Sequence, residues 1–380
     1  MGEVMGEVMT ELVKKMTFTA DEFTFVCGRK IKDVKMGYET WGTLNAEGTN
    51  AIYICAFHSG TAHAAGKYRE TDKKAGYWDA IMGPGKPLDT NKYFFISADN
   101  LCNLRAYDPD VVTTGPASIN PETGKHYAMD FPVMTPRDMT NIQYQLLRSL
   151  KVNKLQAVIG ASLGGVNAYD WPVAYPDFVE RAVGLGAAPI LPAWTLEFES
   201  IWSQAIKLDP RWNNGNYYGK EMPIDGFAMT MRMLSIITYS PDWARNMYDR
   251  KWGDPEKDPG LALDNTFLIE KDISEKGYIR TRMSDPNHMI YLNKMVQMAD
   301  ISRGFPTYED AIKTIKAKVL FYATDKDQLF ALHHVREHYE KFIKNGVKAE
   351  FQVHESPIGH MAIILDTERV GHILEKFLNS

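Results

Sequence analysis

The segment Gln156-Ala-Val-Ile-Gly-Ala-Ser-Leu-Gly-Gly165 combines a serine with the small neighbours that an exposed nucleophile needs. It contains the pattern G-x-S-x-G, between an apolar run typical of a strand and a segment, 166–175, that favours a helix. Small residues at positions 160, 161 and 164 would let the serine stand on a strained strand-to-helix turn. The N–H groups at the start of the helix would face the negative charge that develops during acyl transfer. The segment therefore predicts that Ser162 is a nucleophile.

A nucleophilic serine needs a base that takes its proton and an acid that holds the base in one tautomer. His360 lies in a Gly-His loop after the strand-like run 349–353, and Asp327 follows the strand-like run 319–323. Both residues therefore follow predicted strands, at the sheet edge where open α/β sheets bind ligands. Asp325 follows the same strand, so the spacing leaves Asp325 and Asp327 as alternative acids. Along the chain the serine comes first, the acid second and the histidine third. This is the order found in hydrolases that carry the nucleophilic serine on a strand-to-helix turn of this kind.

Alternating strand-like and helix-like segments predict the elements that position these residues. Such alternation is typical of a mainly parallel, doubly wound sheet. We expect strands at 35–40, 51–57, 93–98, 155–159, 181–185, 319–323 and 349–353, and helices that include 137–150 and 308–315. The alternation breaks between positions 189 and 305, where no clear strand occurs and Met, Trp and Tyr are frequent. We predict a helical lid insertion over Ser162 at 189–305, and an α/β core formed by 1–188 and 306–380.

The composition argues against several other classes of protein. The chain has 380 residues, of which 44% are hydrophobic and 24% charged, and these values are ordinary for a soluble globular protein. A net charge of -5 with scattered lysines argues against a nucleic-acid partner. No apolar run approaches the roughly 18 residues of a membrane span. The start, residues 1–8, is an acidic tandem repeat without an apolar stretch, so we expect no signal peptide.

The cysteines and histidines argue against a disulfide framework and against a metal site. Cys27, Cys55 and Cys102 are an odd number at scattered positions, which is typical of reduced thiols in a cytoplasmic protein. No two histidines stand at a convincing zinc-ligand spacing. We therefore predict free thiols, a cytoplasmic location and no bound metal.

Two long strings resemble the homoserine O-acetyltransferase family of the α/β-hydrolase superfamily. The first is Gly76-Tyr-Trp-Asp-Ala-Ile-Met-Gly-Pro-Gly-Lys-Pro-Leu-Asp-Thr-Asn-Lys-Tyr-Phe94. The second is Thr114-Gly-Pro-Ala-Ser-Ile-Asn-Pro-Glu-Thr-Gly124, which continues through Asp130-Phe-Pro-Val133 to Arg137-Asp138. The resemblance runs over nearly the whole chain. It implies an α/β-hydrolase fold, no bound cofactor, an acyl-CoA such as acetyl-CoA as co-substrate, small-molecule substrates and a homodimer through the lid helices.

The resemblance also implies a role for each member of the predicted catalytic triad. Ser162 would be the nucleophile, His360 the base and Asp327 the orienting acid. In the family the acid precedes a string like Gln328-Leu-Phe330, which favours Asp327 over Asp325.

The same resemblance also implies which residues would hold the oxyanion and the substrate. The loop 57–66 resembles the oxyanion loop of the family, so the backbone N–H groups of His58 and Leu163 would be the two donors. Arg232 falls where family members place an arginine that grips the substrate carboxylate, a task that suits a bidentate guanidinium. A salt bridge on the lid surface is the alternative role for Arg232. Tyr239, in the same segment, is also assigned to substrate binding.

Two positions depart from the family pattern near the expected pocket. Members that use homoserine follow the Gly-His with an aspartate, which can pair with the ammonium of the substrate. This chain has Met361 there, and a thioether cannot neutralise an ammonium. The segment 99–108 replaces a shorter, glycine-rich stretch. Met361 is therefore the substrate-binding position at which we expect this chain to differ from its relatives.

These observations predict a serine-nucleophile acyltransferase of the homoserine O-acetyltransferase type. It would move a short acyl group from acyl-CoA to a hydroxyl acceptor through an acyl-serine intermediate, as in methionine biosynthesis. The alternative is a carboxylesterase that hydrolyses small acyl esters, which Met361 and the segment 99–108 favour. A binding protein without catalysis is a third hypothesis, and the complete set of serine, acid and histidine argues against it.

Overall fold

The computed structural model describes residues 12–380, so the repeat at residues 1–8 lies outside the described residues. Its main sheet consists of β1 (Met16–Thr24), β2 (Lys30–Trp41), β6 (Phe94–Ala98), β3 (Ala51–Cys55), β7 (Leu155–Ala161), β8 (Arg181–Leu185), β9 (Lys318–Thr324) and β10 (Ala349–His354), in this spatial order. The pairs β1–β2 and β2–β6 are antiparallel, and the other neighbouring strands are parallel. A separate parallel pair is formed by β4 (Met82–Gly83) and β5 (Leu88–Asp89). The predicted mainly parallel α/β sheet is confirmed.

Helices follow most of the parallel strands, as the alternation predicted. They are α1 (Pro136–Ser149), α2 (Leu163–Ala174), α3 (Ala193–Leu208), α4 (Ile224–Ile237), α5 (Pro241–Met247), α6 (Leu268–Thr281), α7 (Pro286–Gln297), α8 (Tyr308–Lys313), α9 (Leu332–Lys344), α10 (Ala362–Leu365) and α11 (Thr367–Leu378), with 3-10 turns η1 (Ala128–Asp130) and η2 (Pro210–Gly215). Within residues 12–380, no helix is both long and apolar enough to cross a bilayer.

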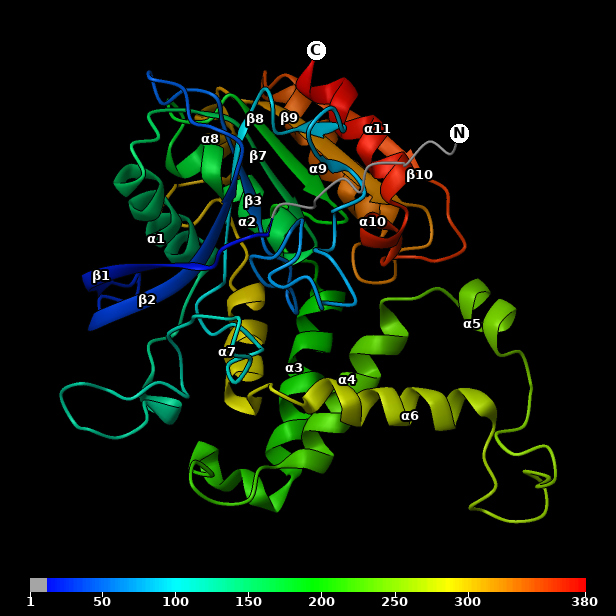
Figure 1. Ribbon diagram of the computed structural model, residues 1–380. Helices are drawn as coiled ribbons and strands as arrows, with labels where there is room; N and C mark the ends of the chain where they lie inside the picture. Colours follow the sequence, from blue (N-terminus) through cyan, green and yellow to red (C-terminus); the bar gives the residue numbers. More distant parts are fainter. Residues whose placement is uncertain (1–11) are drawn as a thin grey trace, which may run out of the picture.

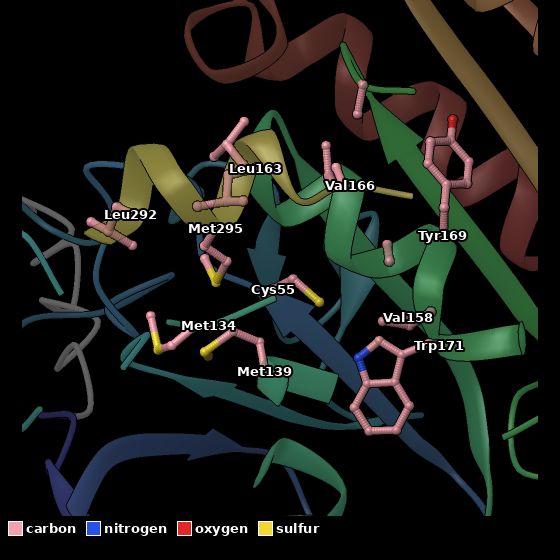
Figure 2. Packing of buried hydrophobic residues seen from close by; sticks show 14 of the residues in the cluster. Cys55, Met134, Met139, Val158, Leu163, Val166, Tyr169, Trp171, Leu292 and Met295 are labelled. Carbon is pink, nitrogen blue, oxygen red and sulfur yellow. The ribbon is translucent and has the colours of Figure 1, made fainter. Parts of the chain in front are cut away.

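The sheet is buried between two hydrophobic layers, and its side chains alternate between them. On the central strand β3, Tyr53 and Cys55 join a cluster with helices α1, α2, α8 and α9. Ile52 and Ile54 join a second cluster with α10 and α11 on the opposite face. This alternation follows from the two-residue repeat of a strand, and burial on both faces explains why the parallel strands are nearly continuous apolar runs. Figure 2 shows part of the first cluster, in which α2 contributes Trp171.

The chain between β8 and β9 forms helices rather than further strands of the sheet. Helix α3 packs on α4 and α7, and α4 packs on α6. These four helices lie beyond one end of the sheet in Figure 1. They correspond to the predicted insertion at 189–305, but the division of the chain into a core and a lid stays a prediction. The thiols of Cys27, Cys55 and Cys102 are free.

Candidate active site

The turn between β7 and α2 places Ser162 at the carboxyl edge of the sheet. Ser162 has φ 54° and ψ −125°, a backbone conformation that is strained for a residue with a side chain. The neighbours have no room for a larger residue. A Cβ on Gly160 would lie 1.9 Å from the carbonyl oxygen of Gly164, and a Cβ on Gly164 would lie 2.3 Å from that of Cys55. The small residues therefore permit the tight turn that exposes the serine hydroxyl.

Ser162, His360 and Asp327 form a continuous chain of hydrogen bonds. His360 Nε2 lies 2.9 Å from Ser162 Oγ, and His360 Nδ1 lies 2.6 Å from Asp327 Oδ2. Because a carboxylate can only accept, the imidazole carries its proton on Nδ1 and leaves Nε2 free to take the proton of the serine. The backbone N–H groups of Leu329 and Phe330 donate to Asp327 Oδ1 at 2.8 and 2.9 Å. These bonds fix the carboxylate while its second oxygen orients the base.

The alternative acid, Asp325, is engaged elsewhere. Its Oδ1 accepts from the backbone N–H of Ser356 at 2.9 Å, within the loop that leads from β10 to His360. Asp325 therefore braces the histidine loop, whereas Asp327 contacts the histidine itself.

Two backbone N–H groups are available among the residues that line the cavity with Ser162. Leu163 is the first residue of α2, and His58 lies in the turn that follows β3. Both residues line the same cavity as Ser162, and neither N–H donates to another group within residues 12–380. The arrangement can hold an oxyanion, because free donors fixed in place need no reorganisation when charge develops.

Ser162 and His360 open into a cavity of about 330 Å³ beneath the helices between β8 and β9. Most of the lining is apolar and comes from the oxyanion loop, from α3, α4 and α6, and from the loops that carry the triad. The residues that line it are Phe57, His58, Ser59, Ser162, Leu163, Thr195, Glu199, Trp202, Leu234, Ser235, Thr238, Tyr239, Trp243, Ile273, Lys276, Ile279, Arg280, Val296, Leu329, Phe330, His360, Met361, Ile363 and Ile364. A cavity of this size suits a small molecule.

Three ionisable groups of helices α3 and α6 line this cavity. Lys276 is paired with Asp272 at 2.8 Å. Glu199 is 4% exposed, and burial raises the pKa of its carboxyl group well above the usual value. Burial lowers the pKa of the Arg280 guanidinium, although arginine remains protonated at neutral pH. The cavity therefore holds a buried Glu199 carboxyl group, a paired Lys276 and a positively charged Arg280.

His58 contributes a second polar group to the cavity through its side chain. Its Nε2 lies 2.9 Å from the side-chain amide of Asn293. The amide of Asn293 forms hydrogen bonds with both its nitrogen and its oxygen when Nδ2 donates to His58 Nε2 and to Glu199 Oε2. Because His58 Nε2 then accepts, the proton of the neutral imidazole is on Nδ1. Nδ1 is buried without a partner within residues 12–380. Burial lowers the pKa of His58 to about 4, and the charge of Arg280 contributes to this shift.

The predicted substrate-binding residues are only partly brought together. Tyr239 and Met361 line the cavity, and the backbone N–H of Met361 donates to Thr238. Arg232 is not among the lining residues, because its side chain lies over Gly277 at the contact between α4 and α6. Its role in substrate binding stays a prediction.

The segment 99–108 does not line the cavity, although we expected it near the pocket. It supports the oxyanion loop from behind. Asp99 accepts from the backbone N–H of Ala62 at 2.8 Å, and Asn103 donates to the carbonyl of Gly60 at 2.9 Å.

Sequence reasoning missed Glu199 and Arg280. A helical spacing does connect Ile273, Lys276 and Arg280, which stand three and four positions apart and so share one face of α6. That spacing alone does not reveal what the face contacts. No cluster of three or more potential metal ligands occurs in the described part of the chain, residues 12–380.

Comparison with known proteins gives consistent matches over most of the chain. Residues 113–367 match the model of the alpha/beta hydrolase fold family. A homoserine O-acetyltransferase of Carboxydothermus hydrogenoformans is 38% identical, over 98% of this chain and 96% of that protein. The X-ray structure of homoserine O-acetyltransferase from Bacillus anthracis has a TM-score of 0.93 at 39% identity and covers 97% of this chain and 98% of its own. The crystal structure of esterase E22 has a TM-score of 0.91 at 36% identity, over 97% and 100% of the two chains.

Proposed function

Because the chain belongs to the homoserine O-acetyltransferase family of α/β-hydrolases, we propose that it transfers a short acyl group from an acyl-CoA to the hydroxyl group of a small acceptor. Acetyl-CoA is the proposed donor. The observation that carries the proposal is the hydrogen-bonded chain from Asp327 through His360 to Ser162, which opens into a largely apolar cavity. Such a cavity limits the access of water to an acyl-enzyme.

The first half-reaction would acylate Ser162. His360 Nε2 takes the proton from Ser162 Oγ while Oγ bonds to the thioester carbonyl carbon. The backbone N–H groups of His58 and Leu163 stabilise the oxyanion that forms. When the tetrahedral intermediate collapses, the carbon–sulfur bond breaks and the proton on His360 passes to the leaving thiolate. Asp327 keeps the imidazole in its reactive tautomer throughout.

The second half-reaction would transfer the acyl group. The hydroxyl group of the acceptor loses its proton to His360 Nε2 and attacks the ester carbonyl of the acyl-serine. Collapse of the second intermediate breaks the bond to Ser162 Oγ, which regains its proton from His360. Water that enters in place of the acceptor would give a carboxylic acid, and transfer would become hydrolysis.

A carboxylesterase is the second candidate, favoured by one residue of the cavity. Met361 follows the triad histidine and lines the cavity, where a thioether offers no charge to an acceptor ammonium. An esterase, E22, is also among the similar solved structures. Family membership and the largely apolar lining of the cavity favour transfer over hydrolysis.

A partition assay separates the two candidates. Purified protein receives acetyl-CoA or p-nitrophenyl acetate, with and without homoserine, and free acetate and O-acetylhomoserine are both quantified. Acetyl transfer well above hydrolysis would support the acyltransferase. Ester hydrolysis without any O-acetylhomoserine would contradict it for homoserine and would call for a screen of other alcohols.

We also propose a homodimer through the helices between β8 and β9. Met229 and Ile236 stand seven positions apart on α4, and both are exposed, as is Ile279 on α6. Exposed apolar side chains on one helix face are typical of a protein–protein interface. Sedimentation velocity tests this assignment, because a monomer at micromolar concentration would contradict it. The cytoplasmic location remains part of the proposal.

A further inference from the structure

Arg280 is a positive charge in the cavity that no protein carboxylate neutralises. It stands in the last turn of α6 and lines the same cavity as Ser162 and His360. Within residues 12–380 it forms no ion pair, and its one hydrogen-bond partner is the hydroxyl of Ser235, at 2.8 Å from Nη1. Arg280 is half-buried, and partial burial of a guanidinium without a counter-charge is unfavourable, so a structural role alone does not explain its place.

The other ionisable groups of the cavity leave this charge uncompensated. Burial raises the pKa of the Glu199 carboxyl group well above the usual value, and this carboxyl group forms no hydrogen bond with Arg280, whose partner is Ser235. Lys276 adds a second positive charge, but its ammonium already contacts Asp272 and the hydroxyl of Tyr248. His58 is neutral at pH 7, since burial lowers its pKa to about 4. The cavity therefore offers a ligand one unpaired cation, the guanidinium of Arg280.

The donors of Arg280 are fixed in place and free to bind. The Ser235 hydroxyl donates to the carbonyl of Met231 at 2.7 Å, which leaves its lone pairs free to accept from Arg280. This bond holds one nitrogen of the guanidinium, and four of its five N–H groups remain without a protein partner within residues 12–380. His58 lines the same cavity, but its Nδ1 is buried and not exposed to it. Two parallel N–H groups of a guanidinium match the two oxygens of a carboxylate.

We propose that Arg280 is the subsite of this cavity for a small organic carboxylate. The carboxylate belongs either to the acyl acceptor, as in a hydroxy acid, or to the far end of the acyl group, as in a half-ester of a dicarboxylic acid. This subsite is separate from Arg232, which lies over Gly277 outside the lining of the cavity. The inference rests on the proposed function for the identity of the cavity as the site of acyl transfer.

The test measures binding in a Ser162→Ala background, where no turnover occurs and failure of the proposed chemistry cannot affect the result. Calorimetry compares 4-hydroxybutanoate with 4-hydroxybutanamide for the acceptor, and monomethyl succinate with methyl butanoate for the acyl group. In at least one pair the carboxylate should bind more tightly by roughly tenfold or more, and Arg280→Met should abolish that preference. The pair that shows the preference identifies the source of the carboxylate.

Arg282→Met is the matched control, because Arg282 is exposed two positions further along the chain and does not line the cavity. It should retain the full carboxylate preference. Thermal unfolding adds a second measurement. Arg280→Met should melt at or above the temperature of the parent protein, and the preferred carboxylate should raise the melting temperature of the parent and of Arg282→Met but not that of Arg280→Met. The proposal is overturned if neither carboxylate is preferred, if Arg280→Met keeps the preference, or if Arg280→Met melts well below the parent as a structural arginine would.

Discussion

Asn103 donates from its side-chain amide to the backbone carbonyl of Gly60 at 2.9 Å and so ties the segment after β6 to the oxyanion loop. Two neighbours act in the same way. Asn100 donates to the carbonyl of Ala56 at 3.3 Å, and Asp99 accepts from the N–H of Ala62. Buried side chains therefore hold both ends of the turn that presents the N–H of His58. The geometry of the proposed oxyanion site depends on residues that never touch a substrate.

Asn103→Ala should lower both the stability and the acylation rate. It leaves the buried carbonyl of Gly60 without its donor, which costs about 1–3 kcal/mol of unfolding free energy. Because the oxyanion exists only in the transition state, kcat should fall more than KM rises. Urea unfolding and steady-state kinetics with p-nitrophenyl acetate measure the two effects. Asn91→Ala, at an exposed position, is the control, and a change in KM alone would contradict a positioning role for Asn103.

Ser162→Ala should abolish acyl-enzyme formation while the protein stays folded. The hydroxyl lies 2.9 Å from His360 Nε2, and its removal takes away the nucleophile without disturbing the backbone turn. Intact mass spectrometry after incubation with a fluorophosphonate probe measures the covalent adduct. Ser149→Ala, at the end of α1, should be labelled like the wild type. A labelled Ser162→Ala protein would show that another residue is the nucleophile.

Asp327→Asn should reduce kcat by roughly 10⁴-fold, because an amide in this position favours the wrong tautomer of the base. Its neighbour Asp325 provides a matched comparison on the same turn. Asp325 accepts a single backbone N–H, from Ser356, and an amide oxygen can also accept it. Asp325→Asn should therefore keep most of the turnover. If Asp325→Asn were the more damaging change, the assignment of the acid would be wrong.

The strands that carry the predicted triad could be identified from sequence because they are buried on both faces. β7 and β9 are almost entirely inaccessible, so each is a short apolar run that ends at a polar residue. The edge strand β1 was not predicted. Its sequence, Met-Thr-Phe-Thr-Ala-Asp-Glu-Phe-Thr, is largely exposed and buries only Ala20 and Phe23. A strand that buries only two of its nine side chains has too weak a hydrophobic pattern to be recognised.

The parts of the site that the sequence does not predict have a different physical cause. The turn chemistry around Ser162 is local, so the sequence predicts it directly. The choice between Asp325 and Asp327 depends on which carboxylate the N–H groups of Leu329 and Phe330 fix, and family resemblance rather than spacing favoured Asp327. Arg280 could not be found in this way, because only the packing of α6 against α4 decides which helix face meets the cavity.

Met361→Asp should improve the use of acceptors that carry an ammonium group. Met361 follows the triad histidine and lines the cavity, where a carboxylate could pair with an ammonium but a thioether cannot. The measurement is the ratio of kcat/KM for homoserine to that for 4-hydroxybutanoate, which lacks the amino group. Met361→Asp should raise this ratio, whereas Met361→Leu should leave it unchanged. If the aspartate left this ratio unchanged, Met361 would not be the residue that determines which acceptor is used.

His58 should make the protein less stable as the pH falls from 6.5 to 4. Burial lowers its pKa from 6.5 to about 4, so across this interval the unfolded chain binds a proton that the folded protein does not. The contribution of His58 to the unfolding free energy is complete above pH 6.5 and is lost as the pH falls to 4. The loss amounts to about 3 kcal/mol.

His58→Gln cannot titrate, and its unfolding free energy should decline less steeply over this interval. Urea unfolding at pH 7.5, 5.5 and 4.5 measures the slopes, with His126→Gln, at an exposed position, as the control. Equal slopes for the wild type and His58→Gln would mean that other groups cause the acid sensitivity and that His58 is not held as a neutral donor at the cavity wall.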